Sequence, residues 1–334
     1  MRFVIAGLGS IGRRHAQNLR SLRPDAEIFA LRRPPSEGRD TDRDSAEPAV
    51  DYTIFDLEEA ISEDPDAAII TNPAPYHTAF SIEFARHGIP LFVEKPLADA
   101  MDGVDELLKI CREQDLCLQV GYNFRFYEPL RQLRELTQAD AIGSIWGAWA
   151  RAGSYLPNWR PGRDYRNTVS ARSDLGGGAV LELSHEFDYL RWILGEPLAV
   201  RAQTRTSGFI EVDVEDHAEA IIEFEAGVLA SVHLSMIQRP PTRRVRLFGT
   251  EGIASCDLLN HRVEVRRSPD SASRTVYQAE ELDTNEMYLQ EMSHFLDCIE
   301  GKVPPAVSGE DGRSTLRLAL AVKRSADNQR RIAL

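Results

Sequence analysis

A lysine beside a proline is the first residue of this chain that could take part in a proton transfer. Lys95 lies between Glu94 and Pro96, directly after the apolar run IPLFVE at 89–94. If that run is a strand of a parallel sheet, the lysine lies at the carboxyl edge, where open α/β proteins bind ligands. A lysine with a pKa lowered by desolvation exchanges protons near neutral pH. Pro96 disfavours helix at the preceding residue, so Lys95 is expected in an extended or turn conformation.

A second candidate for proton chemistry is a histidine in the segment GGGAVLELSHEFDYLRWILGEP, 176–197. A helix is predicted near 179–194, with an apolar stripe at spacings of three and four formed by Val180, Leu183, Phe187, Leu190 and Leu194. Because each residue turns a helix by about 100°, a second set projects roughly opposite, namely Glu182, His185, Tyr189 and Trp192. Aromatic residues beside a histidine are unusual on a solvated face, so this face is expected to line a cleft. The glycines at 176–178 are expected to leave room there for a ligand.

A glycine-rich turn near the start of the chain predicts a dinucleotide site. GLGSIG at 7–12 fits G-x-G-x-x-G, and it follows an apolar strand and opens a helix. In that setting Gly7 permits the tight turn, Gly9 lets the backbone approach a pyrophosphate, and Gly12 lets helix pack on strand. Ser10 and Ile11 lie at the helix N-terminus, which stabilises the anion.

The end of the second predicted strand bears on which dinucleotide binds. A carboxylate there accepts hydrogen bonds from ribose hydroxyls, whereas an arginine attracts a 2′-phosphate. The strand runs into Arg32 and Arg33, and no Asp or Glu stands at that place. The pattern favours NADP over NAD, with both arginines in solvent as the alternative.

Consecutive βα units are predicted for the first part of the chain, from residue 1 to about 121. Short apolar runs predict strands at 2–6, 26–31, 51–55, 66–70, 89–94 and 116–121. Amphipathic segments predict helices near 11–21, 56–63, 77–87 and 100–114. The stretch 32–50 has no apolar period and is expected to be an exposed loop. These elements predict a doubly wound parallel sheet over residues 1–121.

The alternation of short apolar runs with amphipathic segments ends after residue 121. A helix is predicted near 127–138, and strand-like segments without crossover helices fill about 198–278. Such strands form a largely antiparallel or mixed sheet, open on one side unless a partner covers it. Helices near 285–300 and 309–327 close the chain. The sequence therefore predicts an α/β protein whose second domain, 122–334, is α+β with an open sheet.

Composition narrows the classes of function. The 334 residues carry 52 acidic and 39 basic side chains, a formal net charge of −13, which argues against a chain that grips nucleic acid or an anionic membrane. The cysteines Cys111, Cys117, Cys256 and Cys298 form no C-x-x-C pair. No secretory signal precedes the glycine turn, and no apolar run reaches about 18 residues. A cytoplasmic protein with reduced thiols is expected.

With these segments in view, the chain resembles the glucose-fructose oxidoreductase, inositol dehydrogenase and rhizopine-catabolism family, Gfo/Idh/MocA. The resemblance spans nearly the whole chain. Its motifs are GLGSIGRRH at 7–15, TNPAPYH at 71–77, VEKPL at 93–97, GYNFRF at 121–126, GGGAVLELSHEFDYLRWILGE at 176–196, RLFGTEG at 246–252 and EMSHFLDCIEG at 291–301. The family implies a Rossmann domain, a domain with an open sheet, and hydride transfer between a nicotinamide and a sugar or cyclitol carbinol.

The resemblance also implies roles for single residues. Lys95 would handle the hydroxyl proton, and His185 would bind the substrate or help to deprotonate it. The residues implied to border the nicotinamide and its ribose are Thr71, Asn72, Pro73, His77 and Glu94. Trp159 and Arg160 stand where many relatives have a Trp-Arg pair that approaches the nicotinamide or the substrate.

One position departs from the pattern of many relatives, which carry an aspartate four residues before the histidine. Glu182 stands three before it, in ELSH, as in a subgroup with D-L-S-H-E. Both spacings keep the side chains on one helical face. Glu182 is therefore expected either to touch substrate or to orient His185. Resemblance to that subgroup favours an amino-sugar or sugar-nucleotide substrate.

The main hypothesis is a reversible alcohol–ketone oxidoreductase acting on a small sugar-like substrate. Arg125, Tyr155, Trp159, Arg163 and Tyr189 are the candidates for holding that substrate by charge and stacking. Two alternatives stay open: redox-neutral glycoside hydrolysis with a tightly held NAD, and a redox sensor that binds the cofactor and catalyses nothing.

No metal is expected in the reaction, because Glu182, His185 and Asp188 have no second histidine on their face. The other histidines are expected in structural or solvent roles, namely His15, His87, His217, His233, His261 and His294. A second copy of the chain is expected to cover the open sheet, giving a homodimer or homotetramer.

Overall fold

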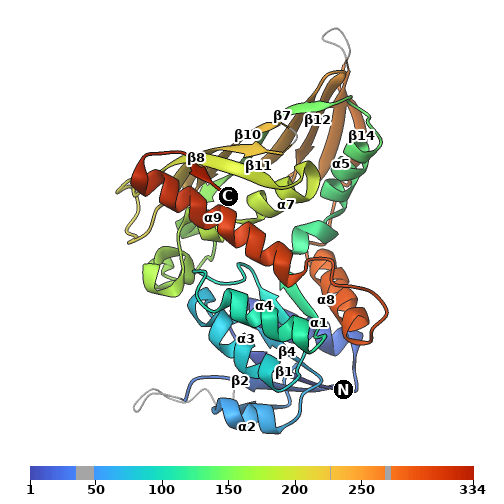
Figure 1. The fold of residues 1–334 in the computed structure, drawn as a ribbon, viewed down its shortest axis with the longest axis vertical. Helices are drawn as coiled ribbons and strands as arrows, with labels where there is room; N and C mark the ends of the chain where they lie inside the picture. The colour runs from blue at the N-terminus through green and yellow to red at the C-terminus, as the bar shows by residue number, and fades with distance from the viewer. Residues whose placement is uncertain (35–48, 226, 268–271) are drawn as a thin grey trace. The chain divides into compact units, whose positions relative to one another are not determined.

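Two compact units make up the chain in the computed structural model (Figure 1), which describes residues 1–34, 49–225, 227–267 and 272–334. The first unit comprises 1–123 together with 285–313, and the second comprises 124–284 together with 314–334. The segment 285–313, which the sequence places with the second domain, thus belongs to the first unit. Part of the predicted loop at 32–50 lies outside the described residues.

A six-stranded parallel sheet forms the centre of the first unit, in the order β3-β2-β1-β4-β5-β6. Its strands are β1 (Arg2–Ala6), β2 (Glu27–Leu31), β3 (Tyr52–Ile54), β4 (Ala67–Ile70), β5 (Leu91–Glu94) and β6 (Leu118–Gly121). All six coincide with predicted strands, and they are apolar because helices cover both faces. The order reverses between β1 and β4, where doubly wound folds bind ligands at the carboxyl ends of the strands.

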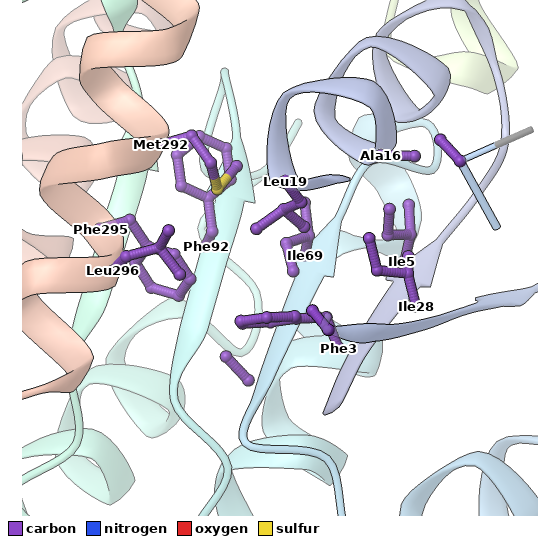
Figure 2. Packing of buried hydrophobic residues seen from close by; sticks show 13 residues of the cluster. Phe3, Ile5, Ala16, Leu19, Ile28, Ile69, Phe92, Met292, Phe295 and Leu296 are labelled. Atoms are coloured by element: carbon purple, nitrogen blue, oxygen red, sulfur yellow. The ribbon is translucent and has the colours of Figure 1, made fainter. Parts of the chain in front are cut away.

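The helices of this unit are α1 (Ser10–Leu22), α2 (Leu57–Ser62), α3 (His77–Arg86), α4 (Val104–Glu113) and α8 (Glu286–Ile299). The Asp56 side chain accepts the backbone N–H of Glu59 and so begins α2. Figure 2 shows why α8 belongs here: Met292, Phe295 and Leu296 pack in the same buried cluster as Phe92 of β5. The Phe92 and Phe295 rings meet edge to face, 5.6 Å between centroids.

A nine-stranded mixed sheet dominates the second unit, in the order β14-β13-β12-β11-β7-β10-β9-β8-β15. Its strands are β7 (Ile145–Tyr155), β8 (Pro197–Arg205), β9 (His217–Phe224), β10 (Leu229–Ser235), β11 (Ile237–Gly249), β12 (Gly252–Asp257), β13 (Arg262–Arg266), β14 (Arg274–Gln278) and β15 (Ile332–Ala333). Strands β7 and β10 are parallel, and the other neighbouring strands run antiparallel. The predicted combination of a Rossmann sheet with a second, mixed open sheet is confirmed.

Burial alternates along the strands of this sheet, so its two faces differ. In β9 the residues Ala218, Ala220 and Ile222 are buried, whereas Glu219 and Ile221 between them are exposed. The helices α5 (Glu128–Gln138), α6 (Ala179–Glu182) and α7 (His185–Leu194) pack against the strands, and α9 (Gly309–Asn328) is the last helix before β15. We call the side that carries Glu219 and Ile221 the outward face. Within the described parts of the chain, no helix combines the length and apolarity needed to cross a bilayer.

The helix predicted over 179–194 is interrupted. Helix α6 ends at Glu182 and α7 begins at His185, with Leu183 and Ser184 between them. At the break the N–H groups of Glu186 and Phe187 donate to carbonyls three residues back rather than four, which tightens the turn. The continuous helix expected from the apolar stripe is therefore wrong at this point, and His185 lies in the first turn of a new helix.

Candidate active site

The glycine turn joins β1 to α1, and its three glycines meet different surroundings. Gly7 has a φ of +102°, and a Cβ there would lie 2.8 Å from the Asn72 backbone nitrogen. A Cβ on Gly12 would collide with the Gly7 carbonyl oxygen. A Cβ on Gly9 would have nothing within 4 Å among the described residues. Gly7 and Gly12 are therefore required by the protein's own packing, whereas Gly9 leaves its surroundings open to a ligand.

The start of α1 suits an anion. Gly9 is the N-cap and brings no capping side chain, and the first turn contains no acidic residue. The first N–H groups of a helix have no intrahelical acceptor, and the helix dipole is positive at that end. Ser10 and Ile11 are the first residues of this helix. The turn thus fits the pyrophosphate of a dinucleotide.

The loop after β4 closes against the same turn. The Thr71 hydroxyl donates to the Gly7 carbonyl oxygen at 2.6 Å. Asn72 follows, and its buried Oδ1 has no hydrogen-bond partner among the described residues. A buried acceptor is costly when unpaired, so Asn72 fits a hydrogen-bond donor supplied by a bound cofactor.

His77 holds two loops of the carboxyl edge together. Its Nε2 lies 2.7 Å from the Asn72 carbonyl oxygen after β4, and its Nδ1 lies 2.9 Å from the Pro96 carbonyl oxygen after β5. Burial lowers the pKa of His77, although the two carbonyls act in the opposite direction. Both ring nitrogens are thus engaged by the backbone, so the structure places His77 as a support for the loops of Asn72 and Pro96.

Lys95 follows the last residue of β5, as the sequence predicts, and is partly buried. Its neighbour Glu94 is buried, and one carboxylate oxygen lies 2.7 Å from Nε2 of the fully buried His15 in α1. The other oxygen of Glu94 accepts the backbone N–H of Lys95 at 3.1 Å. Glu94 and His15 therefore fix the backbone that carries the lysine. His15, the last residue of the motif GLGSIGRRH, is expected from the sequence in a structural or solvent role, and the structure gives it a structural one.

Arg32 and Arg33 follow β2 and are exposed, as are most arginines in loops. The Arg33 guanidinium lies 5.1 Å from the centroid of the Tyr76 ring. Pro73 precedes the short 3-10 helix Ala74–Tyr76 that carries this tyrosine. The two arginines thus remain accessible to an anion.

In the second unit, His185 stacks on Phe124 at 4.5 Å between ring centroids. The Arg243 guanidinium lies 4.4 Å from the same phenyl ring, and it donates two hydrogen bonds of 2.8 and 2.9 Å to the fully buried Glu186. His185 is therefore held by an aromatic side chain that is itself fixed by an ion pair. Phe124 lies in the quoted motif GYNFRF, but nothing in the sequence linked Glu186 to Arg243.

Two residues predicted to hold substrate lie in the interior of this unit. Tyr189 is fully buried, and burial raises the pKa of its hydroxyl well above the usual value. Arg125 donates from Nε and Nη2 to the two oxygens of Asp188 at 3.0 and 2.7 Å, and both side chains are buried. The expected cleft face of the helix is thus buried at Tyr189, and it is only partly buried at His185 and Glu182.

Two of the glycines at 176–178, Gly177 and Gly178, do not leave room for a ligand, contrary to expectation. A Cβ on Gly177 would meet the carbonyl oxygens of Ser170 and Arg172 at 2.8 Å. A Cβ on Gly178 would meet the Glu215 carboxylate at 2.5 to 2.7 Å. These glycines are needed because the chain packs tightly on itself before α6.

The remaining predicted residues lie between β7 and α6. The Trp159 indole N–H donates to the Ser154 hydroxyl at 2.6 Å, and the Arg239 guanidinium lies 3.4 Å from the centroid of the Tyr155 ring. Arg160 and Arg163 are exposed and line a hollow with Asp164, Asn167, Thr168, Val169 and Leu175. The two arginines give this hollow positive charge.

Comparison with known proteins identifies the family. Residues 1–122 match the model described as oxidoreductase family, NAD-binding Rossmann fold, and residues 130–255 match the GFO/IDH/MocA C-terminal domain. The chain belongs to the Gfo/Idh/MocA oxidoreductase family. It is thus an oxidoreductase with an NAD-binding Rossmann domain, as the motifs predict.

Two relatives and one solved structure are among the proteins similar to this chain. The myo-inositol 2-dehydrogenase of Thermotoga maritima is 30% identical, over all of this chain and 98% of its own length. The UDP-N-acetylglucosamine 3-dehydrogenase of Acidithiobacillus ferrooxidans is 26% identical, over 97% and 96% respectively. A solved structure of levoglucosan dehydrogenase in complex with NADH and levoglucosan has a TM-score of 0.86 at 19% identity, over 100% of this chain and 99% of that one. The last comparison shows the shared fold.

Proposed function

We propose that this oxidoreductase interconverts a ring carbinol and the corresponding ketone, with Lys95 and His185 handling the hydroxyl proton. The observation that carries the proposal is the support around Lys95. A buried Glu94 holds its backbone N–H, and a buried His77 holds the Pro96 carbonyl oxygen next to it. A partly buried lysine kept in place at the carboxyl edge of a dinucleotide-binding sheet is suited to proton transfer.

Each of these residues has its own step in the proposed reaction. A bound nicotinamide supplies the hydride acceptor in the oxidising direction. The neutral Lys95 amine accepts the proton as the carbinol O–H bond breaks, and the carbinol C–H bond supplies the hydride, which leaves a C=O bond. His185 hydrogen-bonds the substrate hydroxyl and relays the proton from Lys95 to solvent. Glu182 either orients His185 or contacts the substrate.

We assign cofactor binding to the glycine turn with Ser10 and Ile11, and to the loops that carry Thr71, Asn72 and Pro73. The uncapped start of α1 and the buried Oδ1 of Asn72 support this assignment. Arg32 and Arg33 favour NADP, because an exposed guanidinium pair attracts a 2′-phosphate and no carboxylate directly follows β2.

We further propose a polyhydroxylated six-membered ring as the substrate. The two relatives are named for a cyclitol and an aminosugar nucleotide, and the structure of similar fold is named for an anhydrosugar; all three compounds share such a ring. Arg160 and Arg163 are exposed in a hollow of the second unit, so they suit a phosphate or carboxylate attached to that ring. Arg125 and Tyr189 are assigned to fixing α7, because both are buried.

A substrate panel tests this function. Purified protein is mixed with NAD or NADP and with cyclitols, hexoses and UDP-sugars, and both nicotinamide absorbance and ketone product are measured. The expected result is one equivalent of ketone for each equivalent of reduced nicotinamide. Sugar release without an absorbance change would instead show redox-neutral hydrolysis, and cofactor binding without turnover would show a sensor.

Variants of the two proton-handling residues test their roles. His185→Asn is expected to lower kcat by about 10²-fold or more, since removing a general acid–base group costs about 10²–10⁴-fold. His87→Asn is the control, because His87 is an exposed residue that follows α3. Equal activity of the two variants would exclude His185 from proton transfer.

We also propose that a second copy covers the outward face, giving a homodimer or homotetramer. Ile221 and Leu229 lie opposite Ser231 and Glu223 on this face, and each is 54% exposed. Exposed apolar side chains on a sheet favour association. Light scattering is expected to show a dimer or larger for the parent protein and smaller species for Ile221→Lys.

A further inference from the structure

Two histidines and one glutamate come together on the outward face of the second unit's sheet. His217 and Glu219 are two residues apart in β9, so they point to the same side. His233 lies directly opposite Glu219 in the neighbouring strand β10. One ligand atom from each residue lies within 4.8 Å of those of the other two. No residue of this cluster belongs to the proposed active site.

We propose that His217, Glu219 and His233 form a binding site for a divalent cation of borderline softness, with Zn²⁺ as the reference ion. Imidazole nitrogens and a carboxylate are the ligand set of three-ligand zinc sites, which leave a fourth position for water. The side chains are 29%, 54% and 26% exposed in a single chain, so an ion can reach them before a second copy covers this face.

The distances suit such an ion after small rotations of the side chains. Nδ1 of His233 lies 2.6 Å from Oε1 of Glu219, and Nε2 of His217 lies 3.6 Å from the same oxygen. Tetrahedral bonds of about 2.0–2.1 Å separate neighbouring ligand atoms by about 3.3 Å. The distance from His233 Nδ1 to Glu219 Oε1 must therefore lengthen, and the distance from His217 Nε2 to Glu219 Oε1 must shorten, each by less than about 1 Å.

A fourth residue, Gln238, fixes the orientation of the His233 ring, whose Nδ1 would bind the ion. Gln238 in β11 places its Oε1 3.2 Å from Nε2 of His233, and its Nε2 donates to the Pro240 carbonyl oxygen at 3.1 Å. The amide orientation is thus set, and Oε1 accepts a hydrogen bond from the N–H at Nε2 of His233. Nδ1 is then the ring nitrogen that faces Glu219, and a bound ion would take the place of the proton between Nδ1 and Oε1 of Glu219, as in metal sites where the second ring nitrogen donates to an oxygen.

Gly153 makes this reach possible. It lies in β7, and a Cβ there would approach Cδ of Gln238 to 2.8 Å. The Gln238 side chain therefore passes over β7 at Gly153, because only glycine has no Cβ to hold the amide away from the sheet. Three strands, β9, β10 and β11, thus each contribute to the same small cluster.

Neighbouring charges set a limit on affinity. Arg205 in β8 lies opposite His217, and Arg151 in β7 lies opposite His233. The Arg151 guanidinium lies 5.2 Å from the centroid of the Trp149 ring. Because the positive charge of Arg205 repels a bound cation, the substitution Arg205→Ala is expected to tighten metal binding.

The test is metal binding by the full chain. Protein is stripped with a chelator and titrated with ZnCl₂ by calorimetry, and with CoCl₂, whose tetrahedral complexes absorb in the visible range. The parent protein is expected to bind one ion per chain. The double variant His217→Ala/His233→Ala is expected to lose that site, whereas His87→Ala, which removes an exposed histidine elsewhere, keeps it.

Two further variants separate a built site from a pair of surface histidines. Glu219→Gln keeps the shape but removes the charge and is expected to weaken binding. Gln238→Leu leaves all three ligands and is expected to weaken binding about tenfold, since loss of an outer-shell partner costs about 10–100-fold. Equal melting temperatures would show that the variants fold. Absence of one-site binding in the parent, or unchanged binding in the double histidine variant, would overturn the proposal.

Discussion

The buried ion pair between Arg125 and Asp188 gives the most quantitative prediction. Both side chains are withdrawn from solvent, at 7% and 1% exposure, and two hydrogen bonds of 3.0 and 2.7 Å join them. Asp188→Ala would leave the guanidinium of Arg125 buried without its carboxylate. Removal of one partner from a buried pair costs about 3–5 kcal/mol. We therefore expect the free energy of unfolding of the second unit to fall by that amount.

The assay follows from the position of the tryptophans. The four tryptophans of the chain, Trp146, Trp149, Trp159 and Trp192, all belong to the second unit. Denaturant unfolding followed by intrinsic fluorescence therefore reports on that unit, whereas far-ultraviolet circular dichroism reports on the whole chain. A two-unit protein need not unfold in one step, so the fluorescence transition is the one to compare.

A matched exposed pair provides the control. Arg172 and Asp174 are 45% and 58% exposed, and such surface pairs contribute about 0–1 kcal/mol. Asp174→Ala should therefore leave the fluorescence transition nearly unchanged. The double variant Arg125→Met/Asp188→Leu should lose less than Asp188→Ala, because no charge stays buried. A loss for Asp188→Ala no larger than that for Asp174→Ala would refute this reasoning.

Three other predictions concern the first unit. Gly12→Ala should lower the melting temperature, because a Cβ there meets the Gly7 carbonyl oxygen. Gly9→Ala should keep the melting temperature and weaken dinucleotide binding measured by calorimetry, because a Cβ there meets no described residue. Equal effects of the two substitutions on both properties would contradict this division. The double variant Arg32→Ala/Arg33→Ala should raise the KM for NADP by about tenfold or more, since charge-assisted hydrogen bonds contribute about 1.5–3 kcal/mol. The KM for NAD should stay nearly unchanged. An equal change in KM for both cofactors would argue against a 2′-phosphate site. The pKa of His77 is lowered in the folded state, so as pH falls through about 6.5 the His77 side chain is protonated in the unfolded chain first. The free energy of unfolding should therefore decrease below that pH. His77→Gln should show a shallower decrease when unfolding is followed by circular dichroism, and an equal pH dependence in parent and variant would count against the role of burial.

Local patterns in the sequence are sufficient for most of the first unit. The six parallel strands are predicted because strands covered on both faces must be apolar over short runs. The glycine turn is predicted because tight turns and close packing restrict residue type at Gly7 and Gly12. The position of Lys95 after a strand follows from the same patterns.

Local hydrogen bonding at one helix break and long-range contacts elsewhere explain what the sequence does not predict. The break between α6 and α7 depends on hydrogen bonds at Ser184 that leave the apolar spacing unchanged. The assignment of α8 to the first unit depends on contacts such as Phe92 with Phe295, about two hundred positions apart. Buried pairs such as Glu186 with Arg243 are read as surface charges in a sequence, because their partners are distant along the chain.

Single-turnover hydride transfer in a lysine variant tests the central claim most directly. The parent, Lys95→Met and Lys109→Met are each mixed with oxidised nicotinamide and a substrate deuterated at the reacting carbon, and deuterium transfer is followed by mass spectrometry. Lys109 is the control, because its side chain is 66% exposed in α4. We predict transfer slowed by about 10²–10⁴-fold in Lys95→Met alone. A Lys95→Met protein that transfers deuterium at the parent rate would contradict the proposed role of this lysine.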